Sequence, residues 1–379
     1  MQIQTHPEQT QQQPTQVLRA IGSISGTSMD GIDVAFIETD GDKLVRPGAG
    51  LTYAYAPALR TALLKLLDNP AVAQTDPLDA LEQQVSDAHA GAIQSFMAEQ
   101  GLTRNHVDLI GLHGQTVYHR PEVRFTRQLG LGQRVADRLG VKTVNRFRHA
   151  DVAAGGEGAP FAPLYHRALA AALPASAHPL MLLNLGGVGN VSYIDGETVI
   201  AFDTGPASAL LDDFMQQRRG LPFDEGGALA ASGKADAAVL AALMDNPFFK
   251  RPAPKSLDRN DFHGKAHMVR HLSDADGAAT LAAFTVESVA AALAHVPSAP
   301  RRWLVTGGGR SNLTFMRLLH QRLGVPVEPV EAAGWSGDHI EAQCFGFLAV
   351  RSLRGLPLSL PSTTGVPTPM PGGELWRPA

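Results

Sequence analysis

Apolar and polar positions follow two periods along the chain, and the changes between them mark the expected elements. Near the N-terminus, the apolar runs 17–25 and 32–39 flank a short polar stretch, which predicts two strands joined by a turn. Residues 43–56 are compatible with a third strand. Apolar residues then recur at helical spacing over 57–69 and 78–101, which predicts two helices.

The order of strands and turns seen near the N-terminus repeats near residue 180. Residues 179–206 contain an apolar strand, a glycine-rich turn, a second strand, an Asp-Gly turn and a third strand, in the order already seen near the N-terminus. The residues themselves do not repeat. Two such halves suggest an ancient duplication and would face each other across a cleft. Further strands are expected at 107–114, 141–147 and 301–309, and helices at 131–140, 228–246, 278–296 and 312–324.

Composition and charge limit the classes of protein that the chain can represent. Its 379 residues are too many for one ordinary core, so two domains are expected. A hydrophobic content of 44% and a charged content of 18% are typical of a soluble globular protein. The net charge is −4 with scattered Lys and Arg, which argues against a nucleic-acid surface. The single cysteine, Cys344, allows no internal disulfide and is expected to be buried.

The first 16 residues are rich in Gln, Pro and Thr and have neither a basic cluster nor an apolar run. We expect a disordered tail there rather than a signal peptide. No window is expected to reach the roughly 18 apolar residues that a membrane helix needs, so the expected location is the cytoplasm. We predict a first domain of residues 17–160 plus 364–379 and a second domain of residues 161–363.

Three glycine-rich turns each follow an apolar strand, at Gly26–Gly31, Gly186–Gly189 and Gly307–Gly309. Glycine lets the backbone approach a ligand closely, and successive N–H groups form a nest that suits an anion such as phosphate. The sequence has no GxxxxGK[ST] motif and no GxGxxG motif after its first strand. The pattern therefore favours a phosphate site built from hairpin turns, with acidic residues nearby for Mg²⁺.

Three aspartates are candidates for the chemistry at such a site. Asp30 and Asp33 lie in and just after the first turn. Asp30 either holds a water bound to magnesium or is an ordinary turn residue, and the sequence does not decide between the two. Asp203 ends the apolar run "VIAFD", where an unpaired carboxylate is costly unless it is used. A catalytic base is favoured there over a helix cap.

Other polar residues suggest a sugar site. His113, Gln115 and Thr116 are expected on a loop after a strand, together with His119. A sugar-binding loop fits this set better than a metal site, because no third ligand is evident. Arg148 either pairs with a substrate carboxylate or belongs to a solvated run of charge. Glu341 either caps the helix expected after residue 338 or faces the cleft.

Taken together, these motifs resemble those of the anhydro-N-acetylmuramic acid kinase family. The resemblance runs from residue 21 to residue 365 and rests on "SGTSMDGID", "HGQTVYHRP", "DVAAGGEGAP", "NLGGVGNVSYI", "FDTGPA", "TGGGRSN" and "EAQCFGFLA". This family belongs to the superfamily of sugar kinases, heat-shock ATPases and actin. The resemblance therefore implies an α/β fold with two similar domains of actin-like ATPase (ribonuclease H-like) architecture flanking a central cleft.

The resemblance also implies a reaction. Enzymes of this family use ATP and water to open the 1,6-anhydro ring of anhydro-N-acetylmuramic acid and to phosphorylate O6, in peptidoglycan recycling. It implies that Asp203 is the general base and that Arg148 and Glu341 contact the sugar, beside the predicted loop residues His113, Gln115 and Thr116. The expected nucleotide-binding residues are Gly26, Thr27, Ser28, Met29, Asp30, Gly31, Ile32, Asp33, Gly186, Gly187, Gly307, Gly308 and Gly309. Asp30 and Asp33 are the expected Mg²⁺ residues, acting through water.

This chain departs from the family pattern at a few positions. It has Ala207 and Ser208 where Gly-Asn is usual, Arg146 where Asp is usual, and Glu157 where Gln is usual. Two alternatives therefore stay open, another sugar kinase of the superfamily or a non-catalytic actin-like ATP-binding protein. The expected partners are a small-molecule sugar and ATP, with no nucleic acid and no membrane. The family is often dimeric, so a homodimer is also open.

Overall fold

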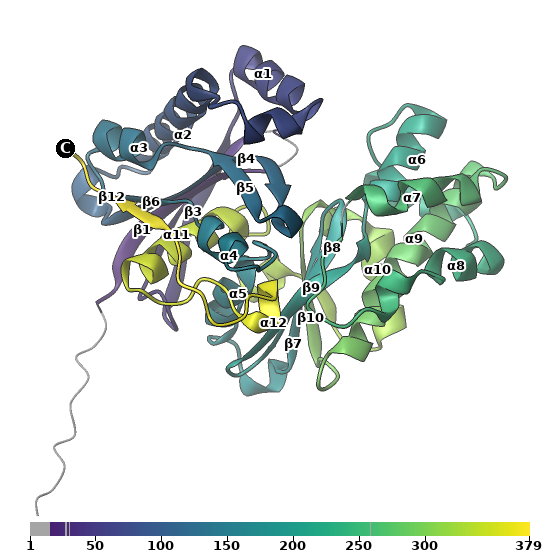
Figure 1. The fold of residues 1–379 in the computed structure, drawn as a ribbon. Coiled ribbons are helices and arrows are strands. Elements are labelled where there is room, and N and C mark those ends of the chain that lie inside the picture. Colours follow the sequence, from purple (N-terminus) through teal and green to yellow (C-terminus); the bar gives the residue numbers. More distant parts are fainter. Residues whose placement is uncertain (1–15, 27–28, 30, 258) are drawn as a thin grey trace, which may run out of the picture.

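A computed structural model describes residues 16–26, 29, 31–257 and 259–379 of the chain. Most of the predicted tail lies outside these residues, as do Thr27, Ser28 and Asp30 of the first turn. Two β-sheets, each flanked by helices, form the two halves of the molecule (Figure 1). The expected α/β class with two similar halves is confirmed.

The first half is built on a mixed sheet with the order β12-β6-β4-β1-β2-β3, and β5 pairs with β4. Its strands β1, β2 and β3 form an antiparallel meander, whereas β4 runs parallel to β1 and β6 runs parallel to β4. The strands span β1 Leu18–Ser25, β2 Ile32–Thr39, β3 Val45–Tyr53, β4 Leu109–Arg120, β5 Phe125–Leu129, β6 Thr143–Asn145 and β12 Glu374–Trp376.

The second half repeats this arrangement on a five-stranded sheet with the order β11-β10-β7-β8-β9. Here β7, β8 and β9 form the antiparallel meander, and β10 and β11 extend the sheet in parallel beyond β7. The shared order confirms that the arrangement of strands repeats in the two halves, as the sequence predicted, whereas the ancient duplication stays a prediction. The strands span β7 Leu180–Leu185, β8 Val188–Asp195, β9 Thr198–Pro206, β10 Arg302–Thr306 and β11 Val327–Pro329.

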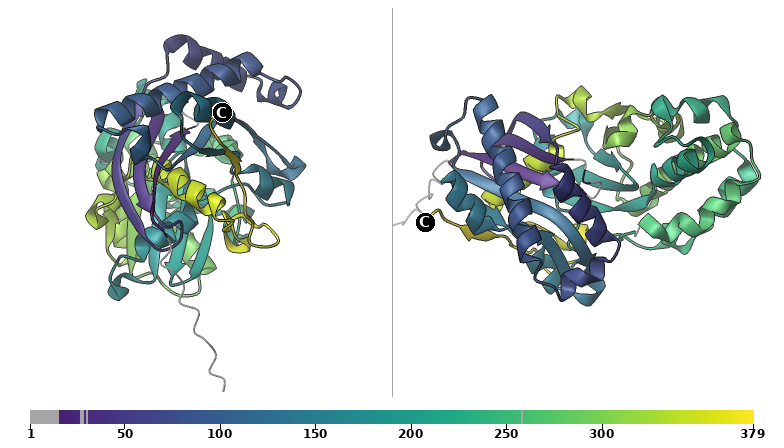
Figure 2. Two further views of the ribbon diagram at one scale, coloured as in Figure 1. Left: turned by 90° about the vertical axis from the view of Figure 1, so that its left-hand side faces the viewer. Right: turned by 90° about the horizontal axis from the view of Figure 1, so that it is seen from above.

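Helices of the first half cover both faces of its sheet (Figures 1 and 2). Helix α2 packs on one face, and helix α11 packs on β1, β2 and β4 from the other. Glycines allow this close approach, because a Cβ at Gly22 would lie 1.7 Å from the carbonyl oxygen of Ala342 in α11. These helices span α1 Pro57–Leu67, α2 Asp79–Glu99, α3 Gly132–Leu139, α4 His149–Ala153, α5 Ala162–Ala170, α11 Ile340–Leu353 and α12 Pro361–Thr364.

The predicted domain boundary stays a prediction. The packing of α11 is relevant to where that boundary lies. Its residues fall in the range assigned to the second domain, yet the helix packs on the sheet of the first half. Helix α5 contacts both α11 and the strands β8 and β9. A single buried cluster consequently joins β1, α5, α11 and β7, and Cys344 is buried within it, as expected.

The second half carries the helices α6 Ala209–Arg219, α7 Ala228–Ser232, α8 Ala237–Met244, α9 Asp274–Ala291 and α10 Leu313–Leu323. The single helical span predicted at 228–246 is wrong, because the chain breaks at Gly233 between α7 and α8. A Cβ at Gly233 would lie 2.0 Å from the carbonyl oxygen of Ala275, so α7 ends where the backbone passes close to α9.

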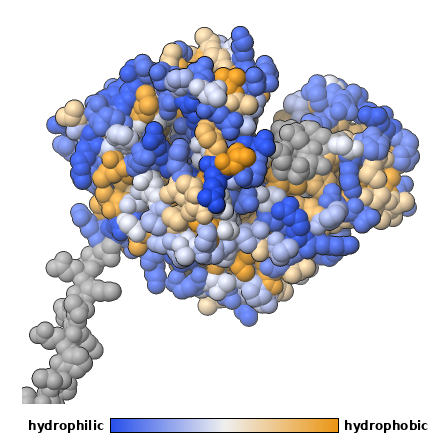
Figure 3. Space-filling view, in the orientation of Figure 1, coloured by the Kyte–Doolittle hydropathy of each residue, from blue (hydrophilic) through white to orange (hydrophobic). Residues whose placement is uncertain are grey.

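One described segment, Asp274–His295, is long and apolar enough by composition to cross a membrane. The prediction that no window reaches this threshold is therefore wrong for this segment. However, 72% of the window is buried inside the second half, where α9 packs against α7, α8 and α10. Its apolar character is accounted for by core packing. The face shown in Figure 3 is mainly hydrophilic, with apolar residues scattered over it.

Candidate functional site

Two adjoining cavities lie between the halves and share Ala159, Pro160 and Asn190 in their walls. The larger, of about 620 Å³, contains Asp203. The smaller, of about 190 Å³, contains Arg148 and Glu341. The structure therefore brings three of the predicted site residues to one continuous region between the two halves, which we call the interdomain site.

Asp203 lies on β9, opposite Asn190 of β8. The segment 255–257 brackets it on the other side: the Asp203 N–H donates to the carbonyl oxygen of Lys255 over 2.9 Å, and the Leu257 N–H donates to Asp203 Oδ2 over 2.8 Å. Burial, with a smaller contribution from the charge of Glu157, raises the pKa of Asp203 from 3.8 to about 7, although the Leu257 hydrogen bond and the charge of Lys255 act in the opposite direction. A carboxyl whose pKa is near neutral is suited to accept a proton.

Lys255 is buried and lies close to this carboxylate. Its ammonium group donates to the carbonyl oxygens of Phe248 and Phe249 and lies 4.6 Å from the centre of the Phe248 ring. Burial lowers the pKa of Lys255 to about 8, although Asp203 opposes that shift. Its positive charge lowers the pKa of Asp203, so the two groups partly offset the cost of each other's burial.

Arg148 is fixed by two hydrogen bonds and two aromatic rings. Its Nε donates to His113 Nε2 over 3.0 Å, and its Nη1 donates to the carbonyl oxygen of Gly158 over 2.6 Å. The guanidinium carbon lies 5.5 Å and 6.0 Å from the centres of the Phe161 and Phe345 rings. Among the described residues no partner of Nη2 is found. The guanidinium group of Arg148 is thus held in one orientation, and its Nη2 can donate hydrogen bonds to an anionic or hydroxyl group of a ligand.

His113 hydrogen-bonds to Arg148 and does not line either cavity of the interdomain site. The ring is buried, and burial together with the charge of Arg148 holds its pKa well below the usual range, so the imidazole is neutral. Because Nε2 accepts from Arg148, Nδ1 carries the proton and donates to the carbonyl oxygen of Gly114. The assigned tautomer follows from these two contacts.

Glu341 is the first acidic residue of α11 and lines the smaller cavity. Its side chain reaches the cavity surface, yet the surrounding protein walls raise the pKa of its carboxyl, and Asp33 raises it further. The charge of Arg148 acts in the opposite direction. A role facing the cleft is thus compatible with the position of Glu341 at the start of α11.

The predicted loop after residue 112 is wrong, because β4 continues to Arg120 and pairs with β5. Within this strand Gln115 is fully buried and its Nε2 donates to the carbonyl oxygen of Gly26, below the first turn. Thr116 pairs with Gln128 of β5. Neither residue lines the two cavities of the interdomain site.

The first turn connects β1 to β2, as predicted, and its described part is tightly packed. Met29 is buried with a positive φ of 55°, and its carbonyl oxygen accepts from Arg60 Nε. Gly31 is required by packing, because a Cβ there would lie 2.7 Å from Thr52 Cγ2. Ile32 is buried in β2, whereas Asp33 accepts a 2.6 Å hydrogen bond from Thr52 Oγ1. Any contact of Met29 and Ile32 with a nucleotide would thus use their backbone.

The two glycine turns of the second half come together around a further cavity of about 550 Å³. Gly186 and Gly187 accept hydrogen bonds from the backbone at the start of α6, and Gly308 and Gly309 face them from the end of β10. A Cβ at Gly308 would meet no atom within 4 Å, and one at Gly186 would meet none closer than 3.7 Å. Packing does not require glycine at these two positions, so the open space suits the close approach of a ligand.

Gly307 and Gly309 have a different role. A Cβ at Gly307 would lie 2.4 Å from Asn184 Oδ1, and one at Gly309 would lie 2.6 Å from Leu185 Cβ. Packing of β10 against β7 therefore explains glycine at both positions. Phe223, which is 54% exposed, and Asn312 line the same cavity, and neither was predicted. An exposed aromatic ring beside open glycine turns suits a flat ring system such as a nucleobase.

Sequence reasoning missed several residues of the interdomain site, among them Asn190, Glu157 and Ser256. Asn190 faces both cavities, and counting back along the hairpin from the Gly196 turn would have placed it opposite Asp203. Glu157 was noted only as a departure from the family pattern. Its 3.0 Å hydrogen bond with Ser256 could not be predicted, because no sequence pattern indicates that contact.

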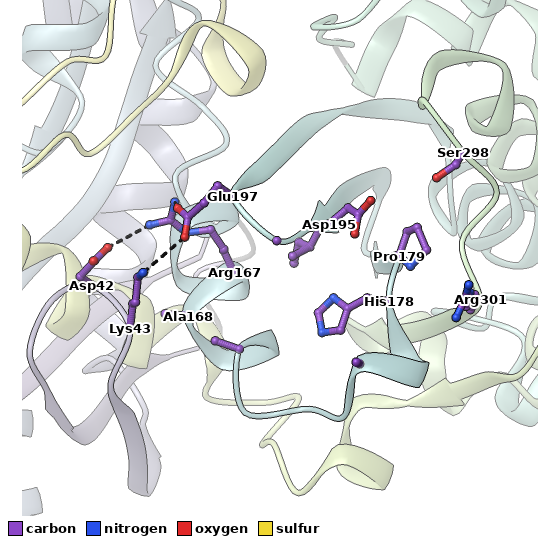
Figure 4. A pocket seen from close by; sticks show the side chains of 14 residues that line it. Asp42, Lys43, Arg167, Ala168, His178, Pro179, Asp195, Glu197, Ser298 and Arg301 are labelled. Carbon is purple, nitrogen blue, oxygen red and sulfur yellow. Dashed lines mark hydrogen bonds and ion pairs between the residues drawn. The ribbon is translucent and has the colours of Figure 1, made fainter.

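Another cavity between the halves, of about 700 Å³, contains none of the predicted site residues (Figure 4). Ion pairs across it join the turn between β2 and β3 to the turn between β8 and β9. Arg167 of α5 pairs with Asp42 over 3.0 Å and with Glu197 over 2.8 Å, and Lys43 also pairs with Glu197. These contacts link the two halves away from the interdomain site.

No group of three or more His, Cys, Asp or Glu side chains suited to a metal is found among the described residues. A magnesium ion that binds mainly through phosphate oxygens and water needs only one or two carboxylates. Asp33 is the one predicted carboxylate for such an ion that the structure describes, since Asp30 lies outside the described residues.

Comparison with known proteins gives a consistent result. The model of the family "Anhydro-N-acetylmuramic acid kinase" matches residues 18–376. The anhydro-N-acetylmuramic acid kinase of Rhodospirillum rubrum is 50% identical over 362 residues, covering 95% of this chain and 94% of that protein. That of Acidiphilium cryptum is 50% identical over 366 residues, covering 95% and 99%.

Among solved structures, component A of the (R)-2-hydroxyglutaryl-CoA dehydratase of Acidaminococcus fermentans aligns with a TM-score of 0.48 at 11% identity, covering 89% of this chain and 99% of that one. A likeness at that level carries no argument about function. The family match and the relatives extend over nearly the whole chain, so the protein belongs to the anhydro-N-acetylmuramic acid kinase family and is a kinase that transfers a phosphoryl group to an alcohol.

Proposed function

We propose that this kinase opens the 1,6-anhydro ring of anhydro-N-acetylmuramic acid with water and phosphorylates O6 with ATP, in the cytoplasm, as part of peptidoglycan recycling. The products are N-acetylmuramic acid 6-phosphate and ADP. The observation that carries the proposal is the half-buried Asp203 carboxylate with its raised pKa, whose cavity adjoins the one lined by Arg148 and Glu341. The relatives that share the family name extend over the whole of this region.

Asp203 is the proposed general base. It removes a proton from the water whose oxygen attacks C1, while the bond from C1 to the bridging O6 breaks. The freed O6 then takes the γ-phosphoryl group, and no covalent enzyme intermediate is needed. A pKa of about 7 leaves Asp203 ionised in a useful fraction of molecules at neutral pH and still able to accept a proton. Catalysis otherwise comes mainly from positioning and from stabilisation of charge.

Arg148 and Glu341 are the proposed sugar contacts. The Nη1–Nη2 edge of Arg148, where Nη2 has no partner among the described residues, suits the lactyl carboxylate of the substrate, because a guanidinium matches a carboxylate bidentately. His113 orients that guanidinium through its 3.0 Å hydrogen bond and is thus a positioning residue. Gln115 is also a positioning residue, because its side chain donates to the carbonyl oxygen of Gly26 in the first turn. Thr116 remains a proposed sugar contact, and no contact of the described residues supports it.

The proposed ATP site uses the turns Gly26–Asp33, Gly186–Gly187 and Gly307–Gly309. The open space at Gly186 and Gly308 supports close approach of phosphates, and Phe223 supports stacking of the base. Asp33 and Asp30 are the proposed residues for Mg²⁺, through water. When bound there, Mg²⁺ would neutralise charge on the transferred phosphoryl group.

The test is a coupled assay of ADP release that compares wild type with Asp203→Asn. We expect wild-type release to depend on both anhydro-N-acetylmuramic acid and Mg²⁺. Because Asn keeps the shape of Asp but cannot take the proton, turnover should fall roughly 10²–10⁴-fold. Near-normal turnover in the variant would reject Asp203 as the base.

The same assay separates the two alternatives. A panel of other sugars and amino sugars would reveal a different acceptor if one of them supported faster ADP release than anhydro-N-acetylmuramic acid. Binding of ATP without release of ADP for any sugar would favour a non-catalytic actin-like protein. Two features argue against another sugar kinase and against a non-catalytic actin-like protein. The guanidinium of Arg148 beside Glu341 suits an anionic sugar, and Asp203 in the adjoining cavity is placed to act as a base.

A further inference from the structure

Glu157 lies in the loop between α4 and α5, and hydrogen bonds with α12, β4 and α4 hold the backbone of Glu157 and of the next residue. Its N–H donates to the carbonyl oxygen of Thr364 over 2.7 Å, and its own carbonyl oxygen accepts from His119 Nε2 over 2.9 Å. The next residue, Gly158, donates its N–H to the buried Asp151 carboxylate. This loop is therefore firmly attached to the first half, and the Glu157 side chain leaves it toward the cavity that contains Asp203.

The Glu157 carboxylate contacts the second half at Ser256. Its Oε2 accepts a 3.0 Å hydrogen bond from Ser256 Oγ. Ser256 is the middle residue of the segment that brackets Asp203, because Lys255 accepts from the Asp203 N–H and Leu257 donates to the Asp203 carboxylate. The segment 255–257 thus binds the proposed base, Asp203, through its first and last residues and binds Glu157 through its middle residue.

We propose that Glu157 is a positioning residue for this reaction: it binds Ser256 across the cleft and thereby fixes the segment that holds the Asp203 carboxylate. The inference rests on the proposed role of Asp203 as the base. When the two halves are joined by this contact, the Leu257 N–H stays directed at Asp203 Oδ2. When the contact is lost, the segment is free to move and the carboxylate loses a well-placed donor.

The charge of Glu157 acts on the same group. Among the residues that the structure describes, two charged groups act on Asp203, Glu157 from the loop after α4 and Lys255 from the bracketing segment, and the Leu257 N–H donates a hydrogen bond to it. Glu157 raises the pKa of Asp203, and Lys255 and Leu257 lower it. Removing the Glu157 charge therefore makes Asp203 a stronger acid, whereas loosening the segment makes it a weaker one.

Two variants separate these effects. Glu157→Gln keeps an oxygen that can accept from Ser256 but removes the charge. Ser256→Ala removes the donor but leaves the Glu157 charge in place. The matched control is Glu287→Gln, which removes a carboxylate from a surface ion pair with Arg322, outside every cavity described above. All three changes are small, and none adds bulk to the core.

The readout is the titration of Asp203 itself. Carbon-13 label in the aspartate carboxyls gives a signal for Asp203 that is identified by its loss in Asp203→Asn. We expect its pKa to fall by about 0.5–1 unit in Glu157→Gln and to rise by a similar amount in Ser256→Ala. The pKa should not change in Glu287→Gln. Shifts of opposite sign support the proposal, and any other pattern, including no shift in either variant, overturns it.

Turnover adds a second readout. At a pH where Asp203 is ionised in both proteins, kcat should stay within about threefold of wild type in Glu157→Gln and fall about tenfold in Ser256→Ala, because only the second loosens the base. The carboxyl titration needs no substrate. If wild type releases no ADP with the anhydro sugar, the proposed function fails while the titration still decides the role of Glu157. If wild type is active and the titrations do not shift, this inference alone fails.

Discussion

Replacing Asp203 with Asn should stabilise the folded protein, and the gain should grow with pH. Wild-type Asp203 is a carboxyl whose pKa burial raises from 3.8 to about 7. In the unfolded chain it ionises at its ordinary pKa. Between these two values the folded state binds more protons than the unfolded state, so wild-type stability falls as the pH rises. Asn carries no charge at any pH and escapes this penalty.

The size of the effect follows from the shift. The difference between 3.8 and about 7 is roughly three units, and one unit corresponds to about 1.36 kcal/mol. The penalty is therefore at most about 4 kcal/mol when the pH is above the folded pKa. Relaxation of the cavity around the charged form would reduce it, and we expect about 2 kcal/mol. The Leu257 N–H can still donate to the side-chain oxygen of Asn, so little should be lost with the substitution.

The assay is thermal unfolding of wild type and Asp203→Asn at several values between about pH 4 and pH 8.5. The two melting temperatures should be close at the acid end, and the variant should melt progressively higher as the pH rises through about 7. Asp108→Asn is a control with the opposite sign, because its ion pair with Arg19 holds the pKa of Asp108 below the usual range. That variant should melt lower than wild type at neutral pH, and its deficit should shrink as the pH falls.

A melting-temperature difference for Asp203→Asn that stays constant with pH would show that the pKa of Asp203 is not raised. So would a difference that shrinks as the pH rises. Either result would mean that the carboxylate is not held with a raised pKa, and the main electrostatic argument for a base at this position would be lost.

Three further substitutions test other parts of the site and the fold. Gly308→Val should raise the KM for ATP at least about tenfold with little change in the KM for the sugar, because a side chain would enter open space beside the expected phosphates, whereas Gly91→Ala on α2 should leave both unchanged. Arg148→Lys should raise the sugar KM roughly 10–100-fold, since an ammonium cannot keep both fixed hydrogen bonds and still offer a fork. Arg167→Met should lower the melting temperature by a few degrees, and less at high salt, because its ion pairs join the two halves; a melting temperature equal to wild type at low salt would contradict that role.

The order of elements could be predicted from sequence because it depends on local signals. Alternating apolar residues, Asp-Gly turns and glycine-rich turns are read within a few residues of each other. The position of Gly186 and Gly308 at one cavity could also be predicted, since both follow apolar strands whose ends meet at one edge of the sheet. The position of Asn190 opposite Asp203 follows from the same hairpin by counting residues.

The roles of individual polar residues could not be predicted because they depend on distant contacts. His113 and Gln115 were expected to bind sugar, yet the parallel pairing of β4 with β1 places Gln115 beneath Gly26, and the fold brings Arg148 against His113. The contact between Glu157 and Ser256 joins residues 99 positions apart and has no periodic signature. The prediction of a loop after residue 112 failed because pairing with β5 keeps the chain extended as far as Arg120.

The central claim is that water opens the anhydro ring and that O6 of the same sugar takes the phosphoryl group. The most direct test is to run the reaction with ATP and anhydro-N-acetylmuramic acid in water enriched in oxygen-18 and to locate the label by mass spectrometry of the product. We expect one labelled oxygen on C1 of N-acetylmuramic acid 6-phosphate, no label in the phosphate, and loss of this product in Asp203→Asn. Label in free phosphate, or a phosphorylated sugar that retains its anhydro bridge, would contradict the central claim.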